Sequence, residues 1–266
     1  MALGVAGADG ARRRLAAGAG NEALLVADQF VVTFDGHLYE LPGSCPLLLS
    51  QDVSSESFTL LLGTDPQSSL LILMNNSTIS IQRTGQVKAG CQSIATHGHY
   101  SDHGLSVRKG SNQVQVSNQH GRSVSCDLQL ELCSFTLDGW FHGASTGLLG
   151  TNTNDAGDDF PLPDGSQAQT LEDFFNGWKL NSSCTKYTET KERSSQAATR
   201  AASCESLFSS PDSLLSSCFR VVDPDQFLSV CKRSSSKAPC RLAAAFVHLC
   251  QENYIPLEIP GLCVET

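Results

Sequence analysis

The sequence has no apolar run of the roughly 20 residues that a membrane-spanning helix needs, so it predicts no transmembrane segment. Charged residues make up only 17% of the chain, and the net charge is −9. Because nucleic-acid binding depends on clustered positive charge, this balance excludes a nucleic-acid-binding surface. None of the 11 cysteines forms a C-x-x-C pair. That spacing argues against a zinc ribbon or a thioredoxin-like redox site.

Widely spaced cysteines instead favour a disulfide framework, which forms in oxidising compartments. Three N-glycosylation sequons, which begin at Asn75, Asn76 and Asn181, point the same way. We therefore predict a secreted, extracellular glycoprotein. The alternative is a cytosolic protein with free thiols. The odd number of cysteines leaves at least one thiol without a partner in this chain.

The composition divides the chain into four parts. Residues 1–22 are rich in Ala and Gly and lack the apolar centre of a secretory signal, so they predict a disordered tail or the artificial start of a fragment. Residues 23–190 contain short β-rich runs. Residues 191–203 are polar and rich in Ser and Ala, which predicts a linker. Residues 204–266 combine six cysteines with helical spacing and predict a small module of helices held by disulfides.

Short apolar or alternating runs, bounded by turn-forming residues, predict antiparallel strands that build a β-sandwich. The runs are residues 29–34, 45–50, 58–62, 70–74 and 77–82, and the longest alternation is 124–132. Thr170 predicts the cap of a short helix over 171–178. In the last part, Asp223-Pro224 predicts the start of a helix over 225–231. An apolar stripe predicts another helix over 241–251.

Two motifs lie about 110 residues apart. The first is Thr33-Phe34-Asp35-Gly36, followed by Gly43-Ser44-Cys45. The second runs from Gly147-Leu148-Leu149-Gly150 to Asp158-Asp159-Phe160 and a P-D-G turn. In this order the pair resembles the signatures of the von Willebrand factor type D domain, and the later cysteines resemble the eight-cysteine module that commonly follows it. The resemblance implies a β-sandwich of antiparallel sheets.

The resemblance also implies a calcium ion near the two motifs. Asp35, Asp155, Asp158 and Asp159 match the family's ligand set, with Asp155 acting through its backbone carbonyl. Thr151 and Thr153 stand where the family has Asn or Asp. Calcium prefers six to eight oxygen ligands, and this loop carries an oxygen on almost every side chain. We therefore predict Ca²⁺ as the ligand, held by these six residues, with Asn152 and Asn154 as alternative ligands.

Leu149 replaces the cysteine that this family has in G-L-C-G, and no cysteine precedes Cys45 to pair with it. The same matching implies a Cys45–Cys184 disulfide. The Leu-Leu-Gly sequence is similar to type D domains at the C-terminal end of large lipid transfer proteins of the apolipophorin and vitellogenin-like group. This similarity implies a non-enzymatic structural or adhesive module within a larger secreted protein. Its partners would be other domains of that chain, extracellular proteins or lipoprotein components.

Two patterns suggest other chemistry. Ser145 lies in a G-x-S-x-G sequence, which a hydrolase needs between a strand and a helix. Here an Asx-rich loop follows, so a bend between strands is the simpler interpretation. His97, His99 and His103 lie close together beside Asp102 and could bind zinc or copper. A solvated loop between strands is the alternative there.

Mapping the peptides of the unreduced protein tests the implied cross-link. We expect a peptide that contains both Cys45 and Cys184. Finding both residues as free thiols in material secreted from cells would contradict the disulfide framework.

Overall fold

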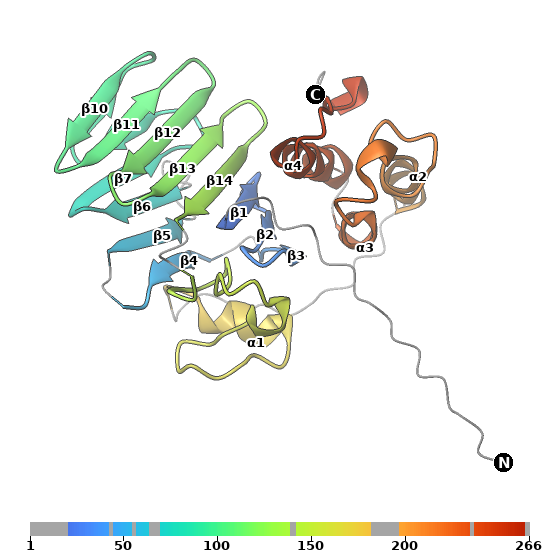
Figure 1. Cartoon of the computed structure of the whole chain (residues 1–266), viewed down its shortest axis with the longest axis horizontal. Coiled ribbons are helices and arrows are strands. Elements are labelled where there is room, and N and C mark those ends of the chain that lie inside the picture. The colour runs from blue at the N-terminus through green and yellow to red at the C-terminus, as the bar shows by residue number, and fades with distance from the viewer. Residues whose placement is uncertain are drawn as a thin grey trace.

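The computed structural model describes residues 21–42, 45–54, 57–63, 70–138, 142–181, 197–234 and 237–263. Within these ranges, two antiparallel sheets pack face to face, and a group of helices lies beside one of them (Figure 1). The predicted fold class, a mainly β antiparallel sandwich with a C-terminal disulfide-rich helical module, is confirmed. Every helix in the described ranges is too short or too polar to cross a lipid bilayer.

The first sheet has eight strands in the order β10-β11-β12-β13-β14-β1-β2-β3. Their bounds are β1 Asn21–Val26, β2 Phe30–Val32, β3 Leu38–Glu40, β10 His99–Asp102, β11 Leu105–Lys109, β12 Gln113–Asn118, β13 Arg122–Asp127 and β14 Leu132–Leu137. The second sheet has the order β15-β4-β5-β6-β7-β8-β9. Its strands are β4 Leu47–Asp52, β5 Phe58–Leu62, β6 Leu70–Met74, β7 Ser77–Ile81, β8 Val87–Ala89, β9 Gln92–Ile94 and β15 Ser145–Thr146.

The space between the sheets holds the main hydrophobic core. Alternate residues of each strand point into it, because successive side chains of a strand face opposite sides. In β5, for example, Phe58, Leu60 and Leu62 are buried, and the residues between them are half-buried. The sequence predicts β5 and β6 with correct bounds, as short apolar runs bounded by turn-forming residues.

No pattern in the sequence predicts strand β1, and its first two residues, Asn21 and Glu22, show that the predicted disordered tail over residues 1–22 extends too far. The run from Glu22 to Val26 contains Ala and Leu, which have no preference for strands. Pairing decides its structure, because β1 lies between β14 and β2 and forms hydrogen bonds with both. Residues 1–20 lie outside the described residues.

The prediction of one strand over residues 124–132 is wrong. The segment is a hairpin in which β13 ends at Asp127 and β14 begins at Leu132. The carboxylate of Asp127 accepts hydrogen bonds from the backbone N–H groups of Gln129 and Leu130, both at 2.9 Å. Such an Asx turn reverses the chain without disturbing the alternation. The Cys126–Cys133 disulfide joins the two strands.

The helices begin with α1, Leu171–Gly177, which lies beneath the sandwich in Figure 1. Thr170 caps it as predicted, by accepting a hydrogen bond from the backbone N–H of Asp173. The remaining helices are α2 Ala197–Phe208, α3 Pro224–Arg233 and α4 Ala238–Glu252, with short 3-10 turns η2 Ala156–Asp158, η3 Ser216–Cys218 and η4 Gly261–Cys263. Asp223 caps α3, as predicted.

Part of the predicted linker is helical. Residues 197–203 form the first turns of α2, and residues 191–196 lie outside the described residues. The run is rich in Ala, the strongest helix former, and it leads to the buried Cys204, Leu207 and Phe208. Disulfides Cys204–Cys231, Cys218–Cys250 and Cys240–Cys263 connect the helices to one another and to the C-terminal segment.

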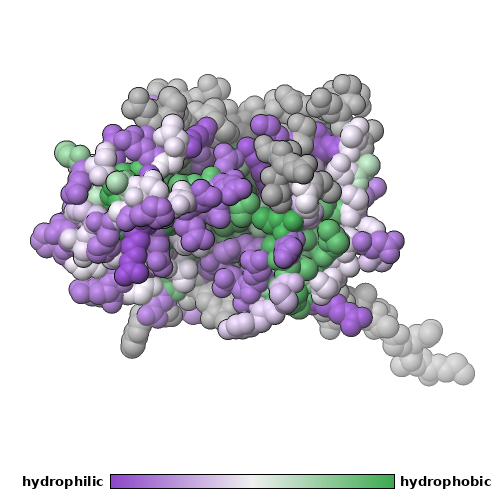
Figure 2. Space-filling model, turned by 90° about the horizontal axis from the view of Figure 1, so that it is seen from above, coloured by the Kyte–Doolittle hydropathy of each residue, from purple (hydrophilic) through white to green (hydrophobic). Residues whose placement is uncertain are grey.

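A second hydrophobic core lies between the helices and the outer face of the first sheet. Side chains of β1, β2, β3 and β14 pack there against α2, α3 and α4. The sheet contributes Leu24, Val26, Phe30, Val32, Leu38 and Leu132. Seen from above, apolar surface gathers near this contact, and the sandwich half is mainly hydrophilic (Figure 2). The helices therefore cover a face of the sheet that is too apolar to face water.

Phe246 of α4 is fully buried in the second core, where its ring contacts those of Phe208, Phe219 and Phe227. We expect Phe246→Ala to lower the free energy of unfolding by about 3–5 kcal/mol, because the cavity cannot close completely. Urea denaturation measures this change. Tyr254→Ala is the control, since Tyr254 is 88% exposed, and should change stability by less than about 0.5 kcal/mol. Equal effects would contradict the assigned core.

Candidate metal centre

The two sequence motifs meet in space at the end of the sandwich. The turn after β2 carries Asp35, and the chain from Gly147 to Gly150 lies against it, so that the N–H of Phe34 donates to the carbonyl of Leu149 at 3.0 Å. The N–H of Leu149 donates to the carbonyl of Leu49 in the second sheet at 2.7 Å. The Gly147–Gly150 segment therefore links both sheets and delivers the following loop to the Asp35 turn.

Three carboxylates converge at this junction. Asp35, Asp158 and Asp159 each offer an oxygen, and these atoms all lie within 4.8 Å of one another. Asp35 and Asp158 are half-buried, whereas Asp159 has no exposed surface. The sequence prediction that these three residues lie together is consistent with this geometry, although they come from segments more than 100 residues apart.

Asp159 is held by donors from the Asp35 turn. The hydroxyl of Thr33 donates to its Oδ2 at 2.6 Å, and Nδ1 of His37 lies 3.1 Å from the same oxygen. Burial raises the pKa of Asp159, the hydrogen bonds from His37 and Thr33 oppose that rise, and the charge of Asp35 adds to it. In its ionised form, Asp159 would carry a buried negative charge that a bound cation would balance. No pattern in the sequence marks Thr33 and His37 as donors at this centre, although Thr33 opens the first motif.

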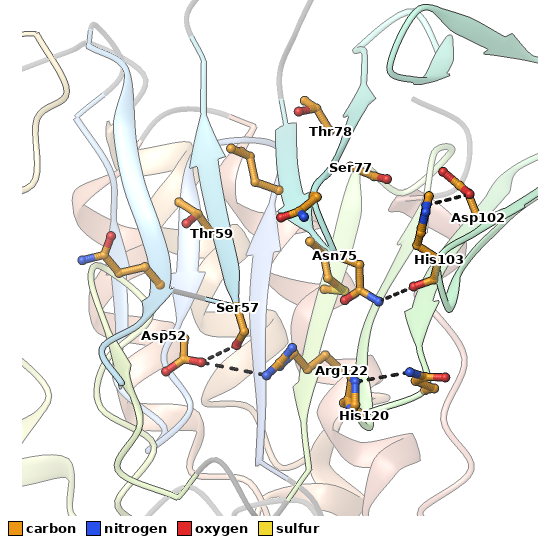
Figure 3. Close-up of a pocket in the computed structure, with 15 residues that line it drawn as sticks. Asp52, Ser57, Thr59, Asn75, Ser77, Thr78, Asp102, His103, His120 and Arg122 are labelled. Carbon is orange, nitrogen blue, oxygen red and sulfur yellow. Dashed lines mark hydrogen bonds and ion pairs between the residues drawn. The ribbon is translucent and has the colours of Figure 1, made fainter. Parts of the chain in front are cut away.

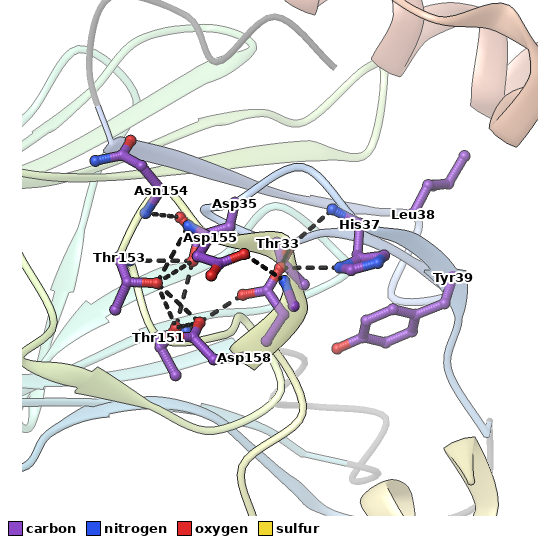
Figure 4. A network of polar contacts seen from close by, with 12 residues as sticks. Thr33, Asp35, His37, Leu38, Tyr39, Thr151, Thr153, Asn154, Asp155 and Asp158 are labelled. Carbon is purple, nitrogen blue, oxygen red and sulfur yellow. Dashed lines mark hydrogen bonds and ion pairs between the residues drawn. The ribbon is translucent and has the colours of Figure 1, made fainter. Parts of the chain in front are cut away.

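Two threonine hydroxyls complete the cluster of oxygens (Figure 4). Oγ1 of Thr151 and Oγ1 of Thr153 lie 2.6 Å and 2.8 Å from Oδ1 of Asp158. They lie 3.3 Å and 3.4 Å from Oδ2 of Asp35. Backbone N–H groups of Thr153 and Asn154 donate to the two oxygens of Asp35 at 3.0 Å and 2.6 Å, which fixes that carboxylate.

Three other residues of the loop have different contacts. The side chain of Asp155 is exposed and caps η2 by accepting from the N–H of Gly157 at 3.0 Å, and its carbonyl accepts from the N–H of Asp158 at 3.1 Å. The amide of Asn154 lies 3.2 Å from His142. Asn152 is fully buried, with a positive φ of 59°. Of the six predicted ligands, five bring a side-chain oxygen to the cluster, and the side chain of Asp155, which was predicted to act through its backbone carbonyl, caps η2 instead.

The donor set fits a calcium ion. All the side-chain donors are hard oxygens, and Ca²⁺ binds such oxygens at about 2.3–2.6 Å, so that ligands on opposite sides lie about 5 Å apart. The three carboxylate oxygens lie within 4.8 Å of one another, close enough for one ion to contact all of them. Asp35, Asp158, Asp159, Thr151 and Thr153 are the residues that would hold the ion.

The profile of the von Willebrand factor type D domain matches residues 24–166, which is more than half of the chain and includes both motifs. The chain belongs to this family. The relatives of this type D domain include Apolipophorins of Locusta migratoria, 30% identical over 91% of this chain and 7% of the locust protein. Apolipophorin of Galleria mellonella is 30% identical over 91% of the chain and 16% of its own length. Human Otogelin is 25% identical over 89% of the chain and 9% of its own length.

The chain thus spans less than a fifth of the length of each of these three relatives. The described part of the type D domain and its helical module contains four disulfides. Such bridges persist in oxidising compartments, which agrees with the family membership. The chain is therefore an extracellular module.

The remaining cysteines differ in their surroundings. Cys45 is buried at the start of β4, and its predicted partner Cys184 lies outside the described residues, so this pairing stays a prediction. Cys91, in the turn between β8 and β9, is an exposed free thiol. Leu149, which replaces the family's cysteine, is fully buried and fills its place with apolar contacts.

Ser145 is not positioned as a nucleophile. It lies on β15, is almost fully buried, and its Oγ contacts Oγ of Ser50 at 2.8 Å and the carbonyl of Gly150 at 3.1 Å. A loop, not a helix, follows β15, so the structure lacks the strand–turn–helix context of a nucleophile elbow in this described segment. The hydroxyl joins β4 to the Gly147–Gly150 segment.

The predicted histidine cluster does not form. His97 lies 3.4 Å from Ser111, His99 lies 3.2 Å from Ser106, and His103 pairs with Asp102 at 2.8 Å. Alternation along β10 and the turns at either end point the three imidazoles to different partners. Within the described residues, the groups of three or more possible metal ligands do not include any of these three histidines.

A polar groove of about 1140 Å³ lies between the ends of the two sheets (Figure 3). Arg122 lies in its floor, over the ring of Phe58, with its guanidinium 3.9 Å from Asp52. Burial lowers the pKa of Arg122, and the charge of Asp52 opposes that change. Asp52 also accepts hydrogen bonds from the hydroxyls of Ser54 and Ser57. The contacts of Arg122 with Asp52 and Phe58 connect the first sheet to the second beside this groove.

Gly150 allows the close approach on which the centre depends. Its φ is +84°, and a Cβ atom there would lie 2.0 Å from Oδ1 of Asp159. We expect Gly150→Ala to lower the free energy of unfolding by about 2–4 kcal/mol, through overpacking as well as backbone strain. Denaturant unfolding measures the change.

Gly165→Ala is the matched control. Gly165 has nearly the same φ of +83°, but a Cβ there meets nothing within 4 Å. We expect only the strain of the left-handed conformation, about 1 kcal/mol. Equal losses at both positions would show that the contact with Asp159 does not matter.

Proposed function

We propose that this chain is a calcium-stabilised, non-enzymatic structural and interaction module of a larger extracellular glycoprotein. The observation that carries the proposal is the convergence of Asp35 with Asp158 and Asp159 around two threonine hydroxyls. Three carboxylates at this distance repel one another, and a divalent cation removes that cost.

An ion at this centre would connect three parts of the domain. Asp35 belongs to the turn between β2 and β3 in the first sheet. The Thr151 and Thr153 loop follows the segment that is bonded to β4 of the second sheet. Phe160, directly after Asp159, packs against Tyr39 of β3 and against Phe174 of α1. Calcium would therefore hold both sheets and α1 in one arrangement, as a rigid docking unit requires.

The proposed setting is a larger lipid-transport-like or matrix protein. Two of the relatives are named as apolipophorins, and the chain matches only a small part of each. We infer that its partners are other domains of such a chain, other extracellular proteins or lipoprotein components. A role without catalysis is supported by the burial of Ser145 and by the separate contacts of the three histidines.

We place the glycan of the double sequon on Asn76. The Asn75-Asn76 turn joins β6 and β7, and Asn76 is exposed. The side-chain amide of Asn75 donates to the carbonyl of His103 at 2.9 Å (Figure 3). Its oxygen accepts from Asn118 at 3.2 Å, so a glycan there would break both contacts. Asn181 is exposed after α1 and offers a further site.

Calcium titration followed by thermal melting tests the proposal. At a free calcium concentration 100 times the dissociation constant, binding should stabilise the folded chain by about 2.7 kcal/mol. For a domain of this size that corresponds to a rise in melting temperature of about 5–10 °C. A chelator should reverse the rise.

Asp158→Asn should weaken calcium binding by at least about tenfold, because it removes a charged ligand. Asp212→Asn, which changes an exposed aspartate of the helical module, should leave the response intact. The calcium centre is excluded if the melting temperature ignores both calcium and chelator, or if Asp158→Asn responds like the parent chain.

A further inference from the structure

A second cluster of metal-binding side chains lies at the contact between the sandwich and the helical module. Glu22 of β1, His248 and Glu252 of α4 each offer one ligand atom, and these atoms lie within 4.8 Å of one another. His248 and Glu252 are four residues apart, so they lie on the same side of α4, one turn from each other. Glu22 faces them from the sheet.

The separation between His248 and Glu22 suits two ligands of a small divalent ion. Nε2 of His248 lies 3.2 Å and 3.3 Å from the two oxygens of Glu22. Two ligands of a tetrahedral zinc ion, at about 2.0–2.2 Å from the metal, lie about 3.3–3.5 Å apart. A direct hydrogen bond gives a similar separation, so the third residue, Glu252, distinguishes a metal site from an ion pair.

Glu22 and Glu252 place negative charge beside His248, and the cluster is exposed enough for an ion to enter. The side chains of His248 and Glu22 are 25% and 15% exposed, and Glu252 is open to solvent. Glu252 is also the last residue of α4, where the helix dipole adds partial negative charge.

We propose that Glu22, His248 and Glu252 form a zinc site that joins the first sheet to the helical module. One imidazole and two carboxylates supply three protein ligands, and water completes the coordination, as in open zinc sites. The site is separate from the calcium centre, whose donors are all oxygens, because a nitrogen ligand shifts the preference towards zinc. Zinc would add a metal link to the contact that Arg241 already makes with Gln29 and Glu131.

Titration of the full chain with Zn²⁺ in the presence of saturating calcium tests the proposal. Calorimetry measures the binding, and thermal melting measures the change in stability. We expect one zinc ion per chain, a higher melting temperature with zinc, and an affinity at least about tenfold lower in Glu252→Gln. Without zinc, Glu252→Gln should melt within about 2 °C of the parent chain, since an exposed side chain contributes little to stability.

Glu258→Gln is the matched control, because it removes the same charge from an exposed residue of the same module. It should bind zinc like the parent chain. The proposal is overturned if the parent chain binds no zinc, if Glu252→Gln binds zinc as tightly as the parent, or if His99→Ala abolishes the binding instead.

Discussion

The buried carboxylate of Asp159 is the constraint on which the arrangement of this domain depends. A charged group without solvent is stable only when donors or a cation surround it. Thr33 and His37 provide donors from the turn after β2, so that turn must lie against the loop after Gly150. Gly150 leaves the necessary space, and the same segment is bonded to the second sheet. One buried charge therefore explains why both motifs are kept together.

The helical module covers the outer apolar face of the first sheet. The first sheet has two apolar faces along β1, β2 and β14, and only one of them faces the other sheet. The helices are short, and three disulfides connect them, which limits the conformational freedom of the unfolded module. Sheet and helices each supply the apolar surface that the other lacks, so the type D domain and its module are best regarded as one folding unit.

Sequence reasoning worked where a local pattern carried the information. Short apolar runs between turn-forming residues identified β5 and β6 with correct bounds, and the caps at Thr170 and Asp223 identified the starts of α1 and α3. Prediction from the sequence failed where pairing with distant strands or a turn determines the local structure. The run before Val26 has no strand pattern, and the alternation at Asp127 continues through a turn in which the chain reverses. In the metal centre, matching to the family identified the three converging aspartates, but not the donors Thr33 and His37.

By itself, the sequence determined the class of the fold and the residues of the two motifs, and its cysteines indicated an oxidising compartment, because residue type, period and spacing are local properties. Only the tertiary structure decided which oxygens meet, that Asp155 turns away to cap η2, and that the helices pack on the outer face of β1 and β2. The meeting of the oxygens and the packing of the helices depend on contacts between residues more than 100 positions apart, whereas the Asp155 cap is a local contact with Gly157. The three-dimensional arrangement of the folded chain, and not its local sequence pattern, determines such contacts.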